Sequence, residues 1–195
     1  VNGLHIATFE LKNSLTKQTV ADAVEQYKRD RDPRELIFQF GRCIAHFAVD
    51  DAEVRFCTDL KSKWFLPFNK GHEGEAGNPP TYGFSSEYLW KEILHKDSIL
   101  ELIQLFIQMT DELDEDGKPT GKKIIIFPRY HQLDAVRKLT DDVRRRGAGG
   151  NYLIQHSAGS GKSNSIAWLA HRLASIHDSA DHRIFNSVVV ITDRR

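Results

Sequence analysis

The stretch YLIQHSAGSGKSNSIAWLAHRL, residues 152–173, decides the fold class of the second half of the chain. An apolar run leads into a loop of small residues, which ends in Lys162-Ser163 at the start of a helix-forming segment. This order of strand, glycine-rich turn and helix is typical of a phosphate-binding loop. The N–H groups of such a turn face the phosphates, and the helix adds the positive end of its dipole. The stretch therefore predicts nucleotide binding.

Each residue of the loop has a place in that site. Glycine is needed where a Cβ atom would block the phosphate or where φ is positive. Lys162 is placed to reach the outer phosphates, and the Ser163 hydroxyl is placed to bind Mg²⁺. The full pattern has a glycine where this chain has His156, and the alternative is an ordinary turn with a coincidental lysine. We assign nucleotide binding to Gly159, Ser160, Gly161, Lys162 and Ser163.

The segments around the loop alternate between strand and helix patterns. We expect strands at residues 124–127, 152–155 and 188–192, and helices at about 130–146 and 162–176. Strands that alternate with helices through short turns predict a parallel α/β sheet.

Gln132 lies in FPRYHQLDAV, residues 127–136, upstream of the loop. A glutamine amide presents a donor beside an acceptor, which matches the edge of adenine. The segment resembles the Q motif of superfamily 2 enzymes, in which an aromatic residue such as Phe127 stacks on the base. The alternative is an exposed helix residue with no ligand.

The first half of the chain reads as a strand at residues 5–11, a helix at 19–29 and a hairpin around Asp50-Asp51. Residues 88–110 have apolar side chains at helical spacing and predict one long helix. Residues 113–123 are acidic and contain Gly and Pro, so we expect a solvated linker there.

Glu10-Leu11-Lys12 ends the first strand. Alternation along a strand predicts that Glu10 and Lys12 share a face, with Leu11 directed into the core. A carboxylate can hold Mg²⁺, and a neighbouring ammonium can stabilise charge on a scissile phosphate. The alternative is a solvated strand edge. The following helix offers Gln26 and Tyr27, but Ala23 stands where a QxxxY pattern needs glutamine.

The composition sets limits on these hypotheses. Lys and Arg number 27, as do Asp and Glu, so any binding of DNA depends on local patches. No apolar run approaches the roughly 20 residues of a membrane span. Cys43 and Cys57 lack the CxxC spacing of a metal cluster, so we expect reduced core thiols in a cytoplasmic protein, with a disulfide between them as the alternative. Both ends interrupt strand patterns, which favours a segment of a longer protein.

Several stretches together resemble the restriction (R) subunit of type I restriction-modification enzymes: HIATFELKN, FQFGRCIAHFAVD, LPFNKG, GNPP, FPRYHQLDAVRKL, the phosphate loop with its helix, and VVVITDRR. The resemblance implies an α/β fold, with a partial PD-(D/E)xK nuclease domain followed by the start of a RecA-like P-loop motor domain with a parallel sheet. It implies a nuclease part at residues 1–112, a linker at 113–123 and the first motor lobe at 124–195.

The resemblance also implies an activity, which is ATP-dependent translocation on unmodified double-stranded DNA with cleavage of both strands. The cofactors would be ATP and Mg²⁺, and the partners would be the methyltransferase (M) and specificity (S) subunits. Glu10 would be a metal ligand, Lys12 the catalytic lysine, Gln132 the adenine reader and Ser163 the ligand of the nucleotide's Mg²⁺. We expect the 195 residues alone to hydrolyse little ATP and not to nick DNA. The alternatives are a superfamily 2 helicase or remodelling ATPase with a non-cleaving DNA-binding domain, and a nucleotide-binding scaffold.

Overall fold

A computed structural model describes residues 3–192. By its internal contacts the chain divides into two units, Val1–Arg129 and Tyr130–Arg195. The strands of the first unit are β1 (Ala7–Leu11), β2 (Ala45–Val49), β3 (Val54–Cys57), β4 (Leu66–Pro67), β5 (Gln108–Leu113) and β6 (Pro119–Ile126). Its helical segments are η1 (Ser14–Thr16), α1 (Val20–Arg29), η2 (Leu36–Phe38), η3 (Leu89–Ile93), α2 (Lys96–Glu101) and η4 (Leu102–Phe106).

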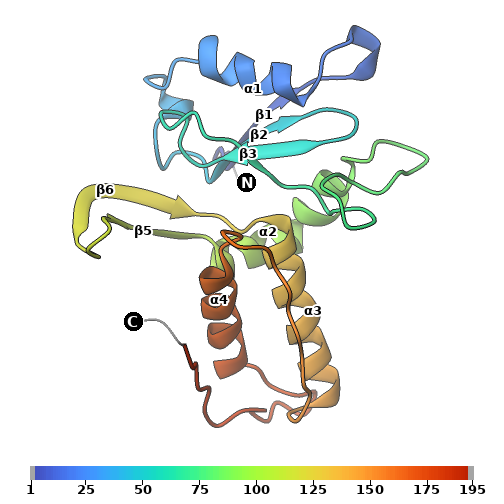
Figure 1. Cartoon of the computed structure of the whole chain (residues 1–195), viewed down its shortest axis with the longest axis vertical. Coiled ribbons are helices and arrows are strands. Elements are labelled where there is room, and N and C mark those ends of the chain that lie inside the picture. The colour runs from blue at the N-terminus through green and yellow to red at the C-terminus, as the bar shows by residue number, and fades with distance from the viewer. Residues whose placement is uncertain (1–2, 193–195) are drawn as a thin grey trace. The chain divides into compact units, whose positions relative to one another are not determined.

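The sheet of the first unit has the order β1-β2-β3-β4, and Figure 1 labels β1, β2 and β3. β1 pairs with β2 in parallel, from Ala7↔Ala45 to Leu11↔Val49, and the remaining pairs are antiparallel. The parallel pair requires a crossover, and the crossover contains α1. The predicted hairpin between β2 and β3 is confirmed. Asp50 Oδ1 stabilises its turn by accepting hydrogen bonds from the backbone N–H groups of Ala52 (2.8 Å) and Glu53 (2.7 Å).

The helix α1 begins one residue after the predicted N-cap, Thr19. Asp22 Oδ2 accepts from the Thr19 backbone N–H at 2.7 Å, which is one half of a capping box. Asp50 Oδ2 accepts from the Val20 N–H at 2.7 Å, so the hairpin turn also caps the helix. The predicted apolar face of α1 packs against the sheet in a core of Val20, Ala23, Val24, Tyr27, Ala48, Cys57 and Leu60.

A second cluster in this unit is aromatic. Phe47, Phe56 and Phe68 are buried, and each ring centroid lies 5.0–6.0 Å from that of Phe127. Cys43 and Cys57 are free, buried thiols, as the sequence predicts.

The single helix expected over residues 88–110 is wrong. The chain forms η3, α2 and η4 in succession, of which η3 and η4 are π-helical, and then enters β5. The break lies at Leu94 and His95, because Leu94 leaves helical geometry (φ −94°, ψ 11°) and His95 is extended (φ −61°, ψ 147°). Burial continues across the break, at Leu89, Ile93, Ile99, Leu102 and Phe106. The apolar spacing thus identified the buried face but not the continuity of the helix.

Residues 113–123, expected to form a solvated linker, instead form part of an antiparallel hairpin of β5 and β6. Asp114 Oδ1 accepts from the N–H groups of Asp116 (3.0 Å) and Lys118 (2.8 Å) and so closes the turn. The segment 124–127, expected as the first strand of a parallel sheet, therefore mostly belongs to an antiparallel strand of the first unit.

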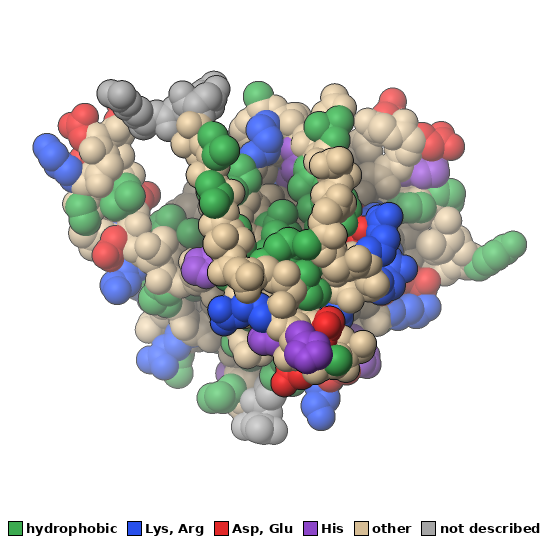
Figure 2. All heavy atoms as spheres, turned by 90° about the horizontal axis from the view of Figure 1, so that it is seen from below, with side chains coloured by type: hydrophobic (Ala, Val, Ile, Leu, Met, Phe, Trp, Pro, Cys, Tyr) green, Lys and Arg blue, Asp and Glu red, His purple; other side chains and the backbone are tan. Residues whose placement is uncertain are grey.

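The second unit consists of α3 (Tyr130–Arg146) and α4 (Lys162–Ala174), which pack against each other at close to their predicted bounds. The expected strands at 152–155 and 188–192 are wrong, since neither segment pairs within the described residues 130–192. Their side chains are exposed, with fractions of 92% at Leu153, 78% at Val189 and 90% at Ile191. Figure 2, which views the molecule from below, shows hydrophobic side chains (green) exposed on that face. An apolar run becomes a buried strand only when neighbouring strands supply its ladder, and the parallel sheet is accordingly not formed here.

No helix in the described part of the chain combines the length and apolar character needed to cross a membrane.

Candidate functional site

One face of β1 carries three polar side chains in alternation, and each of them reaches α1 or the residues just after it. Thr8 Oγ1 lies 2.8 Å from Tyr27 OH, and Lys12 Nζ donates to Gln26 Oε1 at 2.6 Å. Glu10 Oε1 accepts from Arg31 Nε at 2.5 Å. Glu10 and Lys12 therefore lie on one face, as the alternation predicts.

The prediction for Leu11 is wrong, since its side chain is 67% exposed and not in the core. β1 is an edge strand, so side chains on its face opposite α1 have neighbours on one side only. Phe9, on that same face, stacks on Phe47 at 5.5 Å and still remains partly exposed.

The Glu10 carboxylate is 9% exposed and is held by the Arg31 guanidinium. The hydrogen bond to Glu10 raises the pKa of Arg31, so the two groups stabilise each other as an ion pair. Arg31 comes two residues after the end of α1, and no sequence motif indicated that it would turn back to β1. Sequence reasoning missed this residue, because the contact depends on the angle at which α1 crosses the sheet.

The QxxxY pattern assigns no role to Gln26, because the residue four positions before Tyr27 is Ala23 and not glutamine. In the structure the side-chain oxygen of Gln26, on α1, accepts a hydrogen bond from the Lys12 ammonium. An ammonium group has three N–H donors, so Lys12 has two further donors for an anion besides the one that Gln26 accepts.

A buried hydrogen-bonded chain lies beside this face. Thr8 Oγ1 contacts both Tyr27 OH, on α1, and His46 Nδ1, at 2.7 Å on β2. Burial lowers the pKa of His46 to about 4 and raises the pKa of Tyr27 above its ordinary value. His46 is therefore neutral at neutral pH, and the chain fixes α1 over the strand that carries Glu10 and Lys12.

The glycine loop of the second unit leads directly into α4. Gly159 and Gly161 have φ of 72° and 79°, and Gly161 is the N-cap of the helix. Lys162 Nζ donates to the carbonyl oxygens of His156 (3.0 Å) and Ser157 (2.9 Å). The lysine that was predicted to bind phosphate thus lies across its own loop.

The start of α4 presents free backbone donors. No described residue accepts a hydrogen bond from the N–H groups of Gly161, Lys162 or Ser163. Unpaired N–H groups at a helix N-terminus form a site suited to an anion. The loop therefore fits a phosphate group, with Lys162 adjacent and the exposed Ser163 hydroxyl one residue further.

Gln132 projects from α3 to the same loop. Its side-chain nitrogen donates to the carbonyl oxygens of Ser160 (3.1 Å) and Gly161 (2.8 Å), and the residue is 3% exposed. His131 Nε2 lies 3.2 Å from the Ser160 oxygen. Phe127, considered as a stacking partner for a base, is buried among aromatic rings of the first unit.

Buried polar atoms lie close to the loop. Ser160 Oγ, Ser165 Oγ and His156 Nδ1 lack a hydrogen-bond partner among the described residues. A cavity of about 110 Å³ is lined by Ile154, His156, Lys162, Ser165, Ile166 and Leu169.

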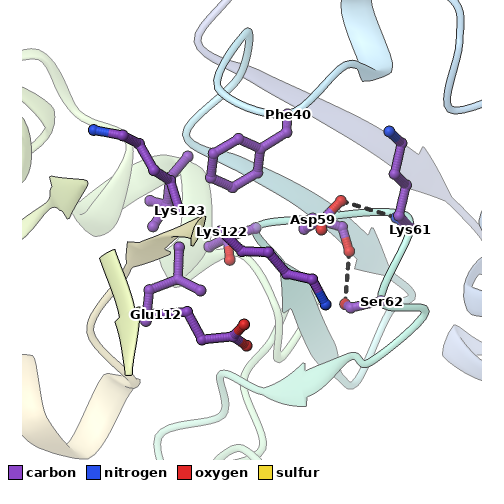
Figure 3. Close-up of a pocket in the computed structure, with 10 residues that line it drawn as sticks. Phe40, Asp59, Lys61, Ser62, Glu112, Lys122 and Lys123 are labelled. Carbon is purple, nitrogen blue, oxygen red and sulfur yellow. Dashed lines mark hydrogen bonds between the residues drawn. The ribbon is translucent and has the colours of Figure 1, made fainter. Parts of the chain in front are cut away.

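A larger cavity of about 610 Å³ lies in the first unit, away from the predicted site residues. Lys122 extends toward Ser62, and Asp59 accepts hydrogen bonds from the Lys61 backbone N–H (2.9 Å) and from Ser62 Oγ (2.7 Å) (Figure 3). The lining of this cavity mixes carboxylates (Asp59, Glu112) with lysines (Lys61, Lys122, Lys123), so it favours neither an anion nor a cation as ligand.

The fit of the two sites to Mg²⁺ is limited. Glu10 offers a carboxylate, but the described residues contain no group of three or more His, Cys, Asp or Glu side chains that could hold a metal. Mg²⁺ prefers six oxygen ligands, so Glu10 would contribute one ligand to a set that needs others.

Residues 1–64 match the family described as type I restriction enzyme R protein N terminus. The matched stretch contains β1, α1, β2 and β3, and with them Glu10, Lys12, Gln26 and Arg31. It covers 64 of the 195 residues, about a third of the chain. No curated protein and no solved structure matched the chain. The family match supports a relation to type I restriction R subunits, and hence to a nuclease family, through the first unit.

Proposed function

We propose that the chain is part of the restriction subunit of a type I restriction-modification system. This subunit would use ATP to translocate unmodified double-stranded DNA and would cleave both strands. The observation that carries the proposal is the family match over residues 1–64, which contains Glu10 and Lys12 on one face of β1. The glycine loop with Lys162, in the same chain, supports the addition of an ATP-driven motor.

In the nuclease part, which resembles a PD-(D/E)xK domain, Glu10 would be one ligand of a Mg²⁺ ion. Bound there, the ion would polarise the scissile phosphate and its attacking water. Lys12, oriented by Gln26, would stabilise negative charge that develops on the phosphate oxygens. Arg31 would have to yield its contact with Glu10 when the carboxylate binds a cation.

In the nucleotide-binding part, the N–H groups of Gly161 and Lys162 would bind the phosphates, with Gly159 and Ser160 shaping the turn. Lys162 would exchange the carbonyl oxygens of His156 and Ser157 for the outer phosphates of ATP. Ser163 would ligate the Mg²⁺ that accompanies the nucleotide. The DNA, methyltransferase and specificity partners of the complete system belong to the same proposal.

One observation favours a second candidate, a superfamily 2 helicase or remodelling ATPase with a non-cleaving DNA-binding domain. The Glu10 carboxylate is already neutralised by Arg31, and its described surroundings hold no further carboxylate cluster. In that case β1 and α1 would form a nuclease-like fold that binds DNA without cutting it.

The deciding experiment places Lys12→Ala and Lys162→Ala separately in the complete subunit, assembled with its partner subunits. ATP hydrolysis and cleavage of unmethylated circular DNA are then measured. We expect Lys162→Ala to abolish both activities and Lys12→Ala to abolish cleavage alone. Lys138→Ala, an exposed lysine on α3, serves as the control. If Lys12→Ala cleaves as well as the wild type, the second candidate is favoured.

A further inference from the structure

We propose that Gln132, together with His131, positions the phosphate loop and takes no part in recognising a base. The site would then bind the polyphosphate of any nucleoside triphosphate, without adenine selectivity from this residue. This inference deepens the proposed nucleotide-binding function and rests on it.

The hydrogen-bonding capacity of the Gln132 amide carries the first step. A carbonyl oxygen can only accept, so the side-chain NH₂ of Gln132, and not its oxygen, must face Ser160 and Gly161. The NH₂ has two hydrogens, and the two carbonyl oxygens use both. No donor remains for the edge of adenine, and the side chain is buried on the face of α3 that also buries Leu133 and Val136.

The geometry of the peptide bond gives these contacts a consequence. In a trans peptide the C=O and the N–H point in opposite directions. Holding the Ser160 and Gly161 carbonyls toward α3 therefore turns the N–H groups of Gly161 and Lys162 away from α3. These two N–H groups are among those from which no described residue accepts a hydrogen bond. The Gln132 amide thus orients the donors that a phosphate would use.

Gly161 provides a separate sign of this close approach. A Cβ atom added at Gly161 would lie 2.5 Å from Gln132 Nε2, a distance that real Cβ contacts do not allow. The loop therefore needs glycine here both for its φ of +79° and for the seat of Gln132.

His131 braces the same loop from the neighbouring position of α3. Its Nε2 lies 3.2 Å from the Ser160 oxygen, so this nitrogen carries the proton. Its ring meets the His156 ring edge to face, with centroids 4.7 Å apart. His156 in turn accepts from Lys162 through its carbonyl oxygen. The two histidines hold the beginning and the end of the loop together.

The test measures the affinities of ATP, GTP and inorganic tripolyphosphate, each with Mg²⁺, by isothermal titration calorimetry on the full chain. The variants are Gln132→Leu, which keeps the size but lacks the amide, and His131→Phe, which keeps the ring. Gln104→Leu, an exposed glutamine in the first unit, is the matched control. We expect Gln132→Leu to weaken all three ligands equally, by about tenfold, for two lost hydrogen bonds. We expect His131→Phe to do the same to a smaller extent.

Weakening of ATP alone, with GTP and tripolyphosphate unchanged, would identify Gln132 as a base reader and overturn the proposal. A ligand-free measurement keeps the test independent of the proposed function: the ¹⁵N order parameters of the Gly161 and Lys162 amides should fall in Gln132→Leu. Unchanged order parameters overturn the positioning role. If the wild type binds none of the three ligands, or if Lys162→Ala binds them as tightly, nucleotide binding fails as a function while the order parameters still decide the role of Gln132.

Discussion

Acidification should destabilise the first unit through a single buried histidine. His46 is 1% exposed, and burial lowers its pKa from 6.5 to about 4. The unfolded chain therefore takes up a proton near pH 6.5, whereas the folded chain resists protonation until about pH 4. Between these values the unfolded state binds more protons, so stability is complete above pH 6.5 and is lost as the pH falls toward 4.

The size of the effect follows from the two pKa values. A difference of 2.5 units at about 1.36 kcal/mol per unit gives about 3 kcal/mol. This is a large part of the stability of an ordinary domain, which is about 5–15 kcal/mol. Protonation would also remove the acceptor at Nδ1 or force Thr8 Oγ1 to accept the bond, and so disturb the chain from His46 through Thr8 to Tyr27.

The assay is urea denaturation at several pH values from 7.5 to 4, for the wild type and for His46→Phe. The variant keeps an aromatic ring and cannot titrate, so the difference between the two proteins isolates His46 from the other ionisable groups. We expect the stability advantage of the wild type to shrink by about 3 kcal/mol between pH 7 and pH 4. A difference that stays constant over this range would refute the reasoning, since it would mean that His46 titrates alike in both states.

Three further predictions follow from the contacts of single residues. Arg31→Ala should lower the free energy of unfolding by about 1–2 kcal/mol, because it leaves the buried Glu10 carboxylate without its partner. Urea denaturation measures this change, and Arg29→Ala, which removes an exposed arginine, is the control. Asp50→Ala should cost about 1–2 kcal/mol in the same assay, because Asp50 closes a hairpin turn and caps α1, and an unchanged midpoint would contradict this double role. Gly161→Ala should weaken binding of tripolyphosphate at least tenfold while circular dichroism keeps its helical signal. Gly159→Ala has a similar positive φ but open space around the added Cβ, so equal losses in the two variants would argue against crowding at position 161.

Local interactions were the part of the fold that the sequence could predict. Thr19 as a cap and the apolar face from Val20 to Tyr27 gave α1, because capping and helical spacing act within a few residues. The pair Asp50-Asp51 gave the β2–β3 turn for the same reason. The length of α3 was also readable, since its periodic face continues without a break.

Contacts between distant residues were not predictable in this way. Lys12 and Gln26 are 14 residues apart, and Glu10 and Arg31 are 21 apart, so each pairing depends on how α1 lies on the sheet. The same limit applies to strands. Residues 124–126 (III) and 188–191 (VVVI) are both runs of β-branched side chains. Within the described residues, only the first run pairs with another strand. An apolar composition indicates that a segment is suited to burial in a sheet, whereas its pairing depends on the strands that the rest of the fold places beside it.

Gln132 illustrates how one side chain can suit two partners, since the sequence predicts contact with adenine and the structure shows contact with the phosphate loop. An amide that suits the edge of adenine, where a donor lies beside an acceptor, can also donate to backbone carbonyl oxygens through its NH₂ group. The sequence fixes the donor and acceptor inventory of the side chain but not the atoms that meet it. Here two carbonyl oxygens of the loop, 28 and 29 residues away, take both hydrogens of the NH₂ group. A glutamine near a phosphate loop can therefore act on the ligand through the backbone, and the comparison of ATP with inorganic tripolyphosphate separates that role from base reading.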